Sequence, residues 1–180
     1  MAWQIDATHS QVIFSVKHMM ISTVKGQFDV LGGKLEIDEQ HPENSWVEAE
    51  VDVASINTRD PNRDGHLRSP DFFDVEKYPK ITFKSTKVES TGDNEYRVKG
   101  NLTMHGVTKE VVFNAEYSGQ VKDLFSGKQR AALTVKATLN RKDFGLNWNK
   151  ALESGGVLVG DKVNIEIDLA AVQVGETVTV

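Results

Sequence analysis

Cysteine is absent from this chain of 180 residues. A thiolate nucleophile, a zinc site ligated by cysteine and a disulfide framework are therefore excluded. Proline is scarce, with 4 residues, while 39% of the chain is hydrophobic and 26% charged, which is typical of a folded globular protein. Because all-β barrels reach this length without splitting, we expect a single domain over residues 1–180.

An excess of positive charge is also missing. The 21 basic and 26 acidic side chains give a formal net charge of −5, and the two signs are interleaved along the whole chain. A surface that binds the phosphate backbone normally carries a basic stripe. We therefore expect no nucleic-acid partner.

Segments that would address or anchor the chain to a membrane are not found either. No apolar run has bilayer-spanning length, so we expect no membrane span. The N-terminal Met-Ala-Trp-Gln-Ile-Asp lacks the basic and apolar regions of a secretory signal. This predicts a cytoplasmic location, or a periplasmic one if the chain has been trimmed of a leader.

Motifs of enzymes and metal sites are missing as well. There is no Gly-x-Ser-x-Gly, phosphate-binding glycine loop or dinucleotide fingerprint, and the glycine-bounded run 155–160 is expected to be a hairpin or the start of a strand. The histidines show no metal-ligating spacing, so we predict no metal, no cofactor and no catalytic residue. They are His9, His18, His41, His66 and His105.

What the chain does contain is alternation of apolar and polar residues, the pattern of strands with one dry and one wet face. Turn-forming residues separate the segments at Gly32-Gly33, Gly92-Asp93-Asn94, His105-Gly106 and Ser126-Gly127. Such strands favour an antiparallel sheet, and small inward residues favour a barrel of about eight strands. The nine expected strands are 12–18, 24–30, 34–38, 47–53, 81–84, 96–104, 110–117, 131–139 and 163–169.

Two stretches interrupt the alternation. Residues 57–79 are polar and contain prolines, and we expect short helical turns there, one beginning at Pro61 and a second at Ser69-Pro70. Residues 147–153 are also expected to form a helical turn. The cluster of charged residues between 59 and 68 is interpreted as a structural connection that closes one end of the barrel, because no nucleophile and base can be paired in it.

Two apolar groups lie outside the alternating strands. Met19, Met20 and Ile21 follow an expected strand end, and Phe72-Phe73 lies on a polar connector. Methionine adapts to irregular ligands, so these side chains either contact a ligand or fill the barrel end as core. The sequence leaves both alternatives open.

Several strings, in order, carry a family resemblance. They are His9-Ser10-x-Val12-x-Phe14-Ser15-Val16-Lys17-His18-Met19, Val24-x-Gly26-x-Phe28, Ala54-Ser55-Ile56-x-Thr58, Arg63-Asp64-x-His66-Leu67-x-Ser69-x-Asp71-Phe72-Phe73-Asp74, Tyr78-Pro79-x-Ile81-x-Phe83-x-Ser85, Gly100-x-Leu102-Thr103-x-His105-Gly106-Val107-Thr108 and Asn140-Arg141-x-Asp143-Phe144-Gly145. Together they resemble the YceI-like family of lipocalin-like, lipid-binding bacterial proteins. The resemblance covers residues 3 to 172, which leaves 173–180 as a C-terminal tail.

The resemblance implies an extended antiparallel, lipocalin-like β-barrel with short helical connections and a hydrophobic interior. It also implies a polyisoprenoid partner, such as an isoprenoid quinone or a polyprenyl phosphate, which would be carried, stored or sensed, and a possible homodimer. His18, Arg63 and His66 are candidates to contact its head group. The full set of expected ligand contacts is Phe14, Val16, His18, Met20, Phe28, Arg63, His66, Leu67, Phe72, Phe73, Phe83, Leu102, Met104, Phe113, Leu133, Phe144 and Trp148.

Two other hypotheses stay open at this point. One is a metal-dependent or hydrolytic site, which would need His9, His18, His66 and His105 to converge with Asp64. The other is an interaction protein, for example a stress factor, whose barrel is filled solid by the same inward side chains.

Overall fold

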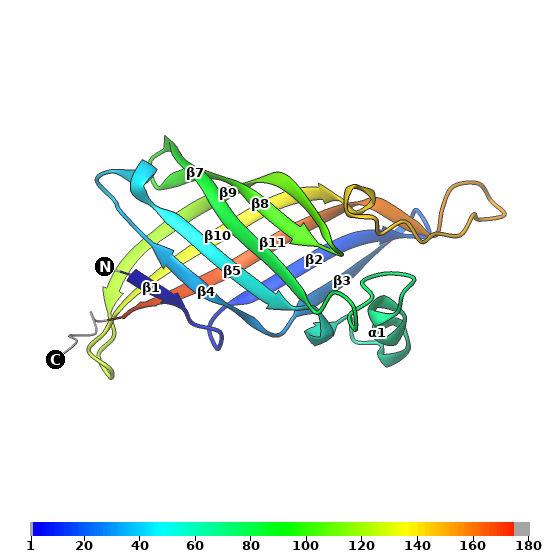
Figure 1. The fold of residues 1–180 in the computed structure, drawn as a ribbon, viewed down its shortest axis with the longest axis horizontal. Coiled ribbons are helices and arrows are strands. Elements are labelled where there is room, and N and C mark those ends of the chain that lie inside the picture. The colour runs from blue at the N-terminus through cyan, green and yellow to red at the C-terminus, as the bar shows by residue number, and fades with distance from the viewer. Residues whose placement is uncertain (1, 175–180) are drawn as a thin grey trace.

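The N-terminal strand β1, Ala2–Ile5, closes the sheet into a barrel. In the computed structural model, which describes residues 2–174, β1 pairs with β4 (Leu31–Glu36) on one edge and with β11 (Val159–Gln173) on the other. The closed cycle runs β1-β4-β5-β7-β8-β9-β10-β11, and every neighbouring pair is antiparallel. The prediction of an eight-stranded antiparallel barrel is confirmed, and Figure 1 shows its extended shape.

The other strands of the cycle are β5 (Trp46–Asp52), β7 (Lys80–Gly92), β8 (Glu95–Met104), β9 (Val107–Lys122) and β10 (Gln129–Asn140). A branch extends from β11 through β2 (Gln11–His18) and β3 (Ser22–Phe28) to the short β6 (Ile56–Asn57). β6 pairs only with residues 27 and 28 of β3. Within residues 2–174, the edge of β3 facing away from β2 is therefore unpaired over residues 22–26.

All nine expected strands are present, and two more are shorter than an alternating pattern can reveal, β1 and β6. The turn expected at Gly32-Gly33 is wrong, because both residues lie inside β4. Gly33 has φ +144, and a Cβ there would lie 2.8 Å from the Cα of Ala49 on β5, so the strands approach too closely for a side chain. The chain instead bends at Asp29 and Val30, whose amides donate to the Ser55 hydroxyl.

The helical turn expected at Pro61 is confirmed as α1, Pro61–Arg68. Asp60 caps it by accepting from the amides of Asn62 and Arg63, and proline occupies the first turn, where no amide is needed. The second helix expected at Ser69-Pro70 is wrong: Ser69 ends α1 by donating to the carbonyl of His66, and turns follow. α1 lies at the end of the barrel opposite the N-terminus (Figure 1).

The helical turn expected over 147–153 is also wrong. Asn149 holds this segment extended, because its side chain both donates to the Val159 carbonyl and accepts from the Val159 amide. A bridge between Ala151 and Val157 then makes a hairpin-like loop that leads into β11, as expected for the run 155–160. The remaining short helices are the 3-10 turns η1 (Pro42–Asn44), η2 (Val53–Ser55) and η3 (Arg141–Phe144).

Of the C-terminal tail predicted for residues 173–180, the first two residues belong to or adjoin the sheet. Gln173 belongs to β11 and pairs with Trp3 of β1, and the amide of Val174 donates to the Ala2 carbonyl. Residues 175–180 lie outside the described residues.

Candidate ligand cavity

The barrel encloses a cavity of about 260 Å³. Side chains on the inward face of the strands, such as Phe14, Val16 and Phe83, are only half-buried, because part of each side chain borders this space. The cavity wall includes side chains from α1 and the turn after it, and from η3 and the segment after it. It also includes side chains from nine strands, β2, β3, β4, β5, β7, β8, β9, β10 and β11. Within the described residues, all of its lining side chains are apolar except Arg141.

Aromatic pairs shape this space. The rings of Phe14 and Phe28 lie 5.5 Å apart, and Phe28 meets Phe73 edge to face at 6.0 Å. Phe83 and Phe113 form another edge-to-face pair at 5.0 Å. Such pairs hold their rings in defined orientations, so the cavity has fixed walls of aromatic rings and aliphatic side chains.

Two core clusters, centred on Trp3 and on Phe144, stabilise the barrel around the cavity. The first cluster contains Trp3, Val53 and Ile56, which are almost completely buried. The second cluster contains Phe144 and Leu146. Members of both clusters, such as Leu31 in the first and Leu102 in the second, line the cavity.

A second cavity of about 80 Å³ adjoins the first and shares five of its lining residues, Leu35, Val47, Val98, Ala115 and Leu133. Its rim is polar. The Tyr117 hydroxyl donates to Glu39 at 2.7 Å, and Gln120 donates to the same carboxylate oxygen at 3.0 Å. Burial, followed by the bond to Glu39, raises the pKa of the Tyr117 hydroxyl, so this tyrosine stays a neutral donor at the rim.

Arg141, at the start of η3, is the charged residue of the main cavity wall, and it was not among the predicted ligand contacts. It is only 5% exposed, and burial lowers its pKa. Its guanidinium donates to the carbonyls of Leu146 (2.6 Å), Trp148 (2.9 Å), Gly160 (2.8 Å) and Val159 (3.3 Å). Arg141 thus fastens the loop after η3 to the start of β11. In the sequence, Arg141 is marked only by its place in the family-like string Asn140-Arg141-x-Asp143-Phe144-Gly145.

The fold and the cavity fit one known family. The sequence model of that family, the YceI-like domain, matches residues 3–171 of this chain. The chain belongs to the YceI-like family.

Among YceI-like relatives, the UPF0312 protein SA2479 of Staphylococcus aureus (strain N315) is 39% identical over 161 residues, which is 89% of this chain and 91% of that protein. The crystal structure of the Campylobacter jejuni YceI protein is 30% identical, with a TM-score of 0.74, and covers 88% of this chain and 90% of that one.

Two more distant structures share the fold. Burkholderia cenocepacia BcnA is 22% identical, with a TM-score of 0.81, and covers 92% of this chain and 98% of that one. A polyisoprenoid-binding domain from Saccharophagus degradans is 18% identical, with a TM-score of 0.68, and covers 96% of this chain and 98% of that one. At these identities the likeness concerns the YceI-like fold alone.

The structure of this YceI-like barrel brings eleven of the expected contact residues together around the main cavity. The other six are outside its lining. Those in the wall are Phe14, Val16, Phe28, Leu67, Phe72, Phe73, Phe83, Leu102, Met104, Phe113 and Leu133, and those outside it are His18, Met20, Arg63, His66, Phe144 and Trp148.

Each of the outside residues has a local reason for its position. Arg63 donates to the hydroxyl and the carbonyl of Thr58, at 2.7 and 2.6 Å, so its guanidinium fixes the start of α1. Met20 is exposed in the turn after β2. His18 ends β2 beside that turn, and Phe144 is buried in the second core cluster.

His66 and Trp148 lie behind the cavity wall and touch it through Phe72. The three rings pack against one another, with centroids 4.7 to 5.3 Å apart, and Phe72 lines the cavity. His66 also forms a 3.0 Å bond between its Nε2 and Asp71. This cluster joins α1, the turn after it and the 146–150 segment at one end of the barrel.

The histidines are held by separate partners in this YceI-like chain. His9 contacts Asp6 and Thr8, His66 contacts Asp71, and His105 contacts the Phe144 carbonyl. Within residues 2–174 no three His, Asp or Glu side chains are grouped so that they could hold a metal. The convergence that a histidine-based site requires is therefore not formed.

Asp64, the carboxylate considered with those histidines, is buried, and its Oδ1 accepts two hydrogen bonds. It accepts from the amide of Thr58 at 2.8 Å and from its hydroxyl at 2.5 Å. The Arg63–Thr58–Asp64 group is a structural connection, as interpreted from the sequence.

Among the described helices, none is long and apolar enough to cross a bilayer.

Proposed function

We propose that the barrel binds one long apolar lipid chain of the isoprenoid type in its interior. The observation that carries the proposal is the cavity of about 260 Å³, whose wall is apolar apart from Arg141, a residue already bonded to four backbone carbonyls. The volume is close to the lower end of small-molecule pockets, roughly 300–1,000 Å³. It suits a narrow hydrocarbon chain.

Energetics support a ligand. A cavity in a core lowers folding stability by roughly 24 cal/mol per Å³. An open space of about 260 Å³ therefore lowers stability by several kcal/mol relative to a barrel filled by larger side chains. Apolar cavities of about 150 Å³ stay dry and accept hydrophobic guests. Each methylene-sized group that enters contributes about 0.8 kcal/mol, so an apolar chain binds here without directed hydrogen bonds.

The isoprenoid class is supported by the family and by the polyisoprenoid-binding domain from Saccharophagus degradans, which shares the fold. The role proposed is binding, for carriage, storage or sensing, and not catalysis. A branched isoprenoid also matches walls made of rings and branched aliphatic side chains, such as Phe14, Phe83 and Ile165. Contacts of His18, Arg63 and His66 with a head group stay predictions, and of these His66 touches the wall through Phe72.

Native mass spectrometry of the purified protein, followed by solvent extraction of whatever dissociates, tests this function. We expect one isoprenoid molecule per chain, and the same spectrum checks the predicted homodimer. A protein that is empty and also refuses isoprenoid quinones and prenyl phosphates would contradict the proposal and favour a barrel that acts as an interaction protein.

A pair of variants makes the test specific to the interior. Ala115 on β9 lines both cavities, whereas its neighbour Asn114 is exposed. Successive strand residues point to opposite faces, so Ala115→Phe fills the cavity and Asn114→Phe does not. We expect Ala115→Phe to lower lipid affinity by about tenfold or more, and Asn114→Phe to bind as the unchanged protein does.

A further inference from the structure

Four exposed apolar side chains form a tip at the end of the barrel where β2 turns into β3. Ile21 is 86% exposed and Met20 58%, and Met19 precedes them in the turn. Val157 lies in the adjacent loop, which is held to the turn by a 2.8 Å bond from the Met19 amide to the Leu158 carbonyl. We call Met19, Met20, Ile21 and Val157 the apolar tip.

The backbone conformation of this turn does not favour the methionine side chains that it carries. Met19 and Met20 have φ values of 53° and 69°, and the Ile21 amide donates to the His18 carbonyl. A turn with two left-handed central residues favours Asn-Gly, because longer side chains are strained in that region. Strain of this kind is kept where the side chains serve another purpose.

The apolar tip lies at an end of the barrel that the main cavity reaches. His18, next to Met19, pairs with Val159 of β11, and Val159 lines the cavity. The β3 edge beginning at Ser22, directly after Ile21, is the edge left unpaired within residues 2–174. A lipid leaving or entering at this end therefore passes close to the tip.

The charge around the tip has the sign that an anionic membrane attracts. Segment 17–25 carries Lys17 and Lys25 and no acidic residue, and the loop 150–158 that holds Val157 adds Lys150 and Glu153, whose charges offset each other, although the whole chain has a formal net charge of −5. Both lysines are exposed or partly exposed on β2 and β3. Basic residues flanking exposed apolar side chains are the arrangement of segments that lie in the bilayer interface.

We propose that the apolar tip inserts into the interface of an anionic lipid bilayer and holds the cavity end of the barrel against it. The proposal rests on the proposed function, since a carrier of a membrane lipid must meet the membrane. Four side chains are too few for a stable protein interface, which buries about 800 Å² on each partner, but a bilayer accepts an insertion of this size. Methionine side chains adapt to disordered acyl chains.

Vesicle sedimentation tests the proposal, using vesicles of phosphatidylglycerol and phosphatidylcholine in equal parts, and of phosphatidylcholine alone. We expect the full chain to bind the anionic vesicles more tightly than the neutral ones. The variant carrying Met19→Asn and Met20→Gly removes two apolar side chains while giving the turn its favoured residues. We expect it to unfold at a higher temperature and to bind anionic vesicles at least about tenfold more weakly.

The opposite end of the barrel provides the matched control. Leu124 and Phe125, in the turn between β9 and β10, are 95% and 102% exposed, and Lys122 and Lys128 flank them, so this turn is similar to the apolar tip in composition and differs from it in position. The variant with Leu124→Ser and Phe125→Ser is expected to bind vesicles as the unchanged chain does. Loss of binding in this control, with binding kept when Met19 and Met20 are replaced, would overturn the proposal.

Site-specific labelling reports insertion directly, because the chain has no cysteine. An environment-sensitive fluorophore on Ile21→Cys is expected to shift to shorter wavelength when anionic vesicles are added. The same label on Phe125→Cys is expected to keep its emission. Equal shifts at both positions, or none at Ile21, contradict insertion of the tip.

Failure of the tip and failure of the proposed function are separable. Lipid binding in the absence of vesicles is measured with a short isoprenoid quinone, and the variant with Met19→Asn and Met20→Gly is expected to keep it, because neither residue lines the cavity. Vesicle binding that persists in this variant rejects the tip even when quinone binding is intact. A chain that sediments with vesicles but refuses the quinone rejects the proposed function alone.

Discussion

The ring of Phe14 on β2 lies over Gly26, its partner across the β2–β3 pair. A Cβ on Gly26 would lie 2.9 Å from Cε1 of the ring and 2.8 Å from the methyl group of Thr58. Phe14 lines the main cavity. The missing side chain of Gly26 is therefore what allows the ring to lie against the wall and leaves the cavity open.

The first prediction follows from this contact. Gly26→Ala forces the Phe14 ring away from β3 and into the cavity, since Thr58 blocks the other side. We expect lipid affinity to fall by about tenfold, with a stability loss of about 1 kcal/mol, because the ring moves into open space and not into packed atoms. Titration with an isoprenoid quinone and urea unfolding measure the two effects.

Gly32→Ala is the control for this substitution. Gly32 lies on β4, and a Cβ there would meet nothing within 4 Å. Replacing glycine where space and backbone allow it leaves stability unchanged or raises it by about 0.4–1 kcal/mol. Equal losses of lipid affinity in both variants would show that the Phe14–Gly26 contact does not set the cavity.

Much of the fold could be predicted from the sequence, because a strand with one dry face has a period of two residues that is visible in the chain. The alternation gave the nine longer strands and the inward residues that line the cavity. Strand β1 was not predicted, because its four residues, Ala2–Ile5, are too few to show a period of two. Closure of the barrel depends on that strand, so it could be expected from the family resemblance but not from the pattern.

The candidate site was harder to predict where a polar side chain acts on the backbone. Arg63, whose contact with a head group stays a prediction, uses two of its donors on Thr58, five residues earlier in the chain. The role of Arg141 depends on carbonyls up to 19 residues away in an irregular loop. Every residue has a backbone carbonyl, so the sequence does not show which carbonyl accepts a hydrogen bond, and neither set of contacts could be predicted from a pattern.

The second prediction concerns Arg141. Arg141→Lys replaces a planar group that reaches the carbonyls of Leu146, Trp148 and Gly160 with a single ammonium that cannot span them. We expect a loss of about 3 kcal/mol or more, as for other buried charges whose bonds are broken. Hydrogen exchange over residues 146–160 is expected to rise more than in the strands, since Arg141 fastens this loop.

Lys142→Met is the matched comparison for Arg141→Lys. Lys142 is the next residue in η3 and is exposed, and its ammonium lies 3.4 Å from Asp161. An exposed ion pair of this kind contributes about 0–1 kcal/mol. Similar losses in the two variants would mean that Arg141 acts as a surface charge and not as the bond between the loop and β11.

The third prediction concerns the start of α1. Asp64→Ala removes the buried carboxylate whose Oδ1 accepts both hydrogen bonds from Thr58, and we expect a loss of about 1–3 kcal/mol in urea unfolding. Asp60→Asn is the control, because asparagine caps a helix as well as aspartate does. Unchanged stability in Asp64→Ala would show that Thr58 and α1 are held by other contacts.

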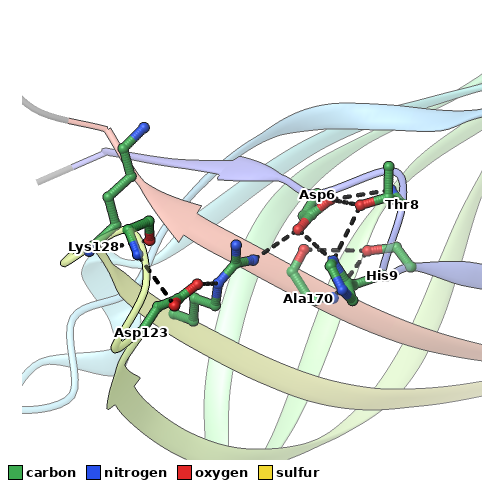
Figure 2. A network of polar contacts seen from close by, with 9 residues as sticks. Asp6, Thr8, His9, Asp123, Lys128 and Ala170 are labelled. Atoms are coloured by element: carbon green, nitrogen blue, oxygen red, sulfur yellow. Dashed lines mark hydrogen bonds and ion pairs between the residues drawn. The ribbon is translucent and has the colours of Figure 1, made fainter.

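The fourth prediction uses an acid-sensitive network at the end opposite α1. Arg130 donates to Asp123 at 2.7 Å and to Asp6 at 2.8 Å, and Asp6 also accepts from Thr8 and contacts His9 (Figure 2). The bond from Arg130, together with those from the Phe125 and Ser126 amides, lowers the pKa of Asp123 from 3.8 to about 2. The bond from the Thr8 hydroxyl, with those of His9 and Arg130, holds the pKa of Asp6 well below its ordinary value.

Because both carboxylates have lowered pKa values in the folded chain, their stabilisation is complete above the ordinary aspartate pKa of 3.8 and is lost as the pH falls toward 2. Arg130→Met removes the cation they share. We expect the difference in unfolding free energy between the unchanged chain and this variant to be constant from neutral pH down to about 4, and to shrink as the pH falls further. Urea unfolding at a series of pH values measures it. A difference that stays constant through this acid range would show that neither carboxylate depends on Arg130 for its ionisation.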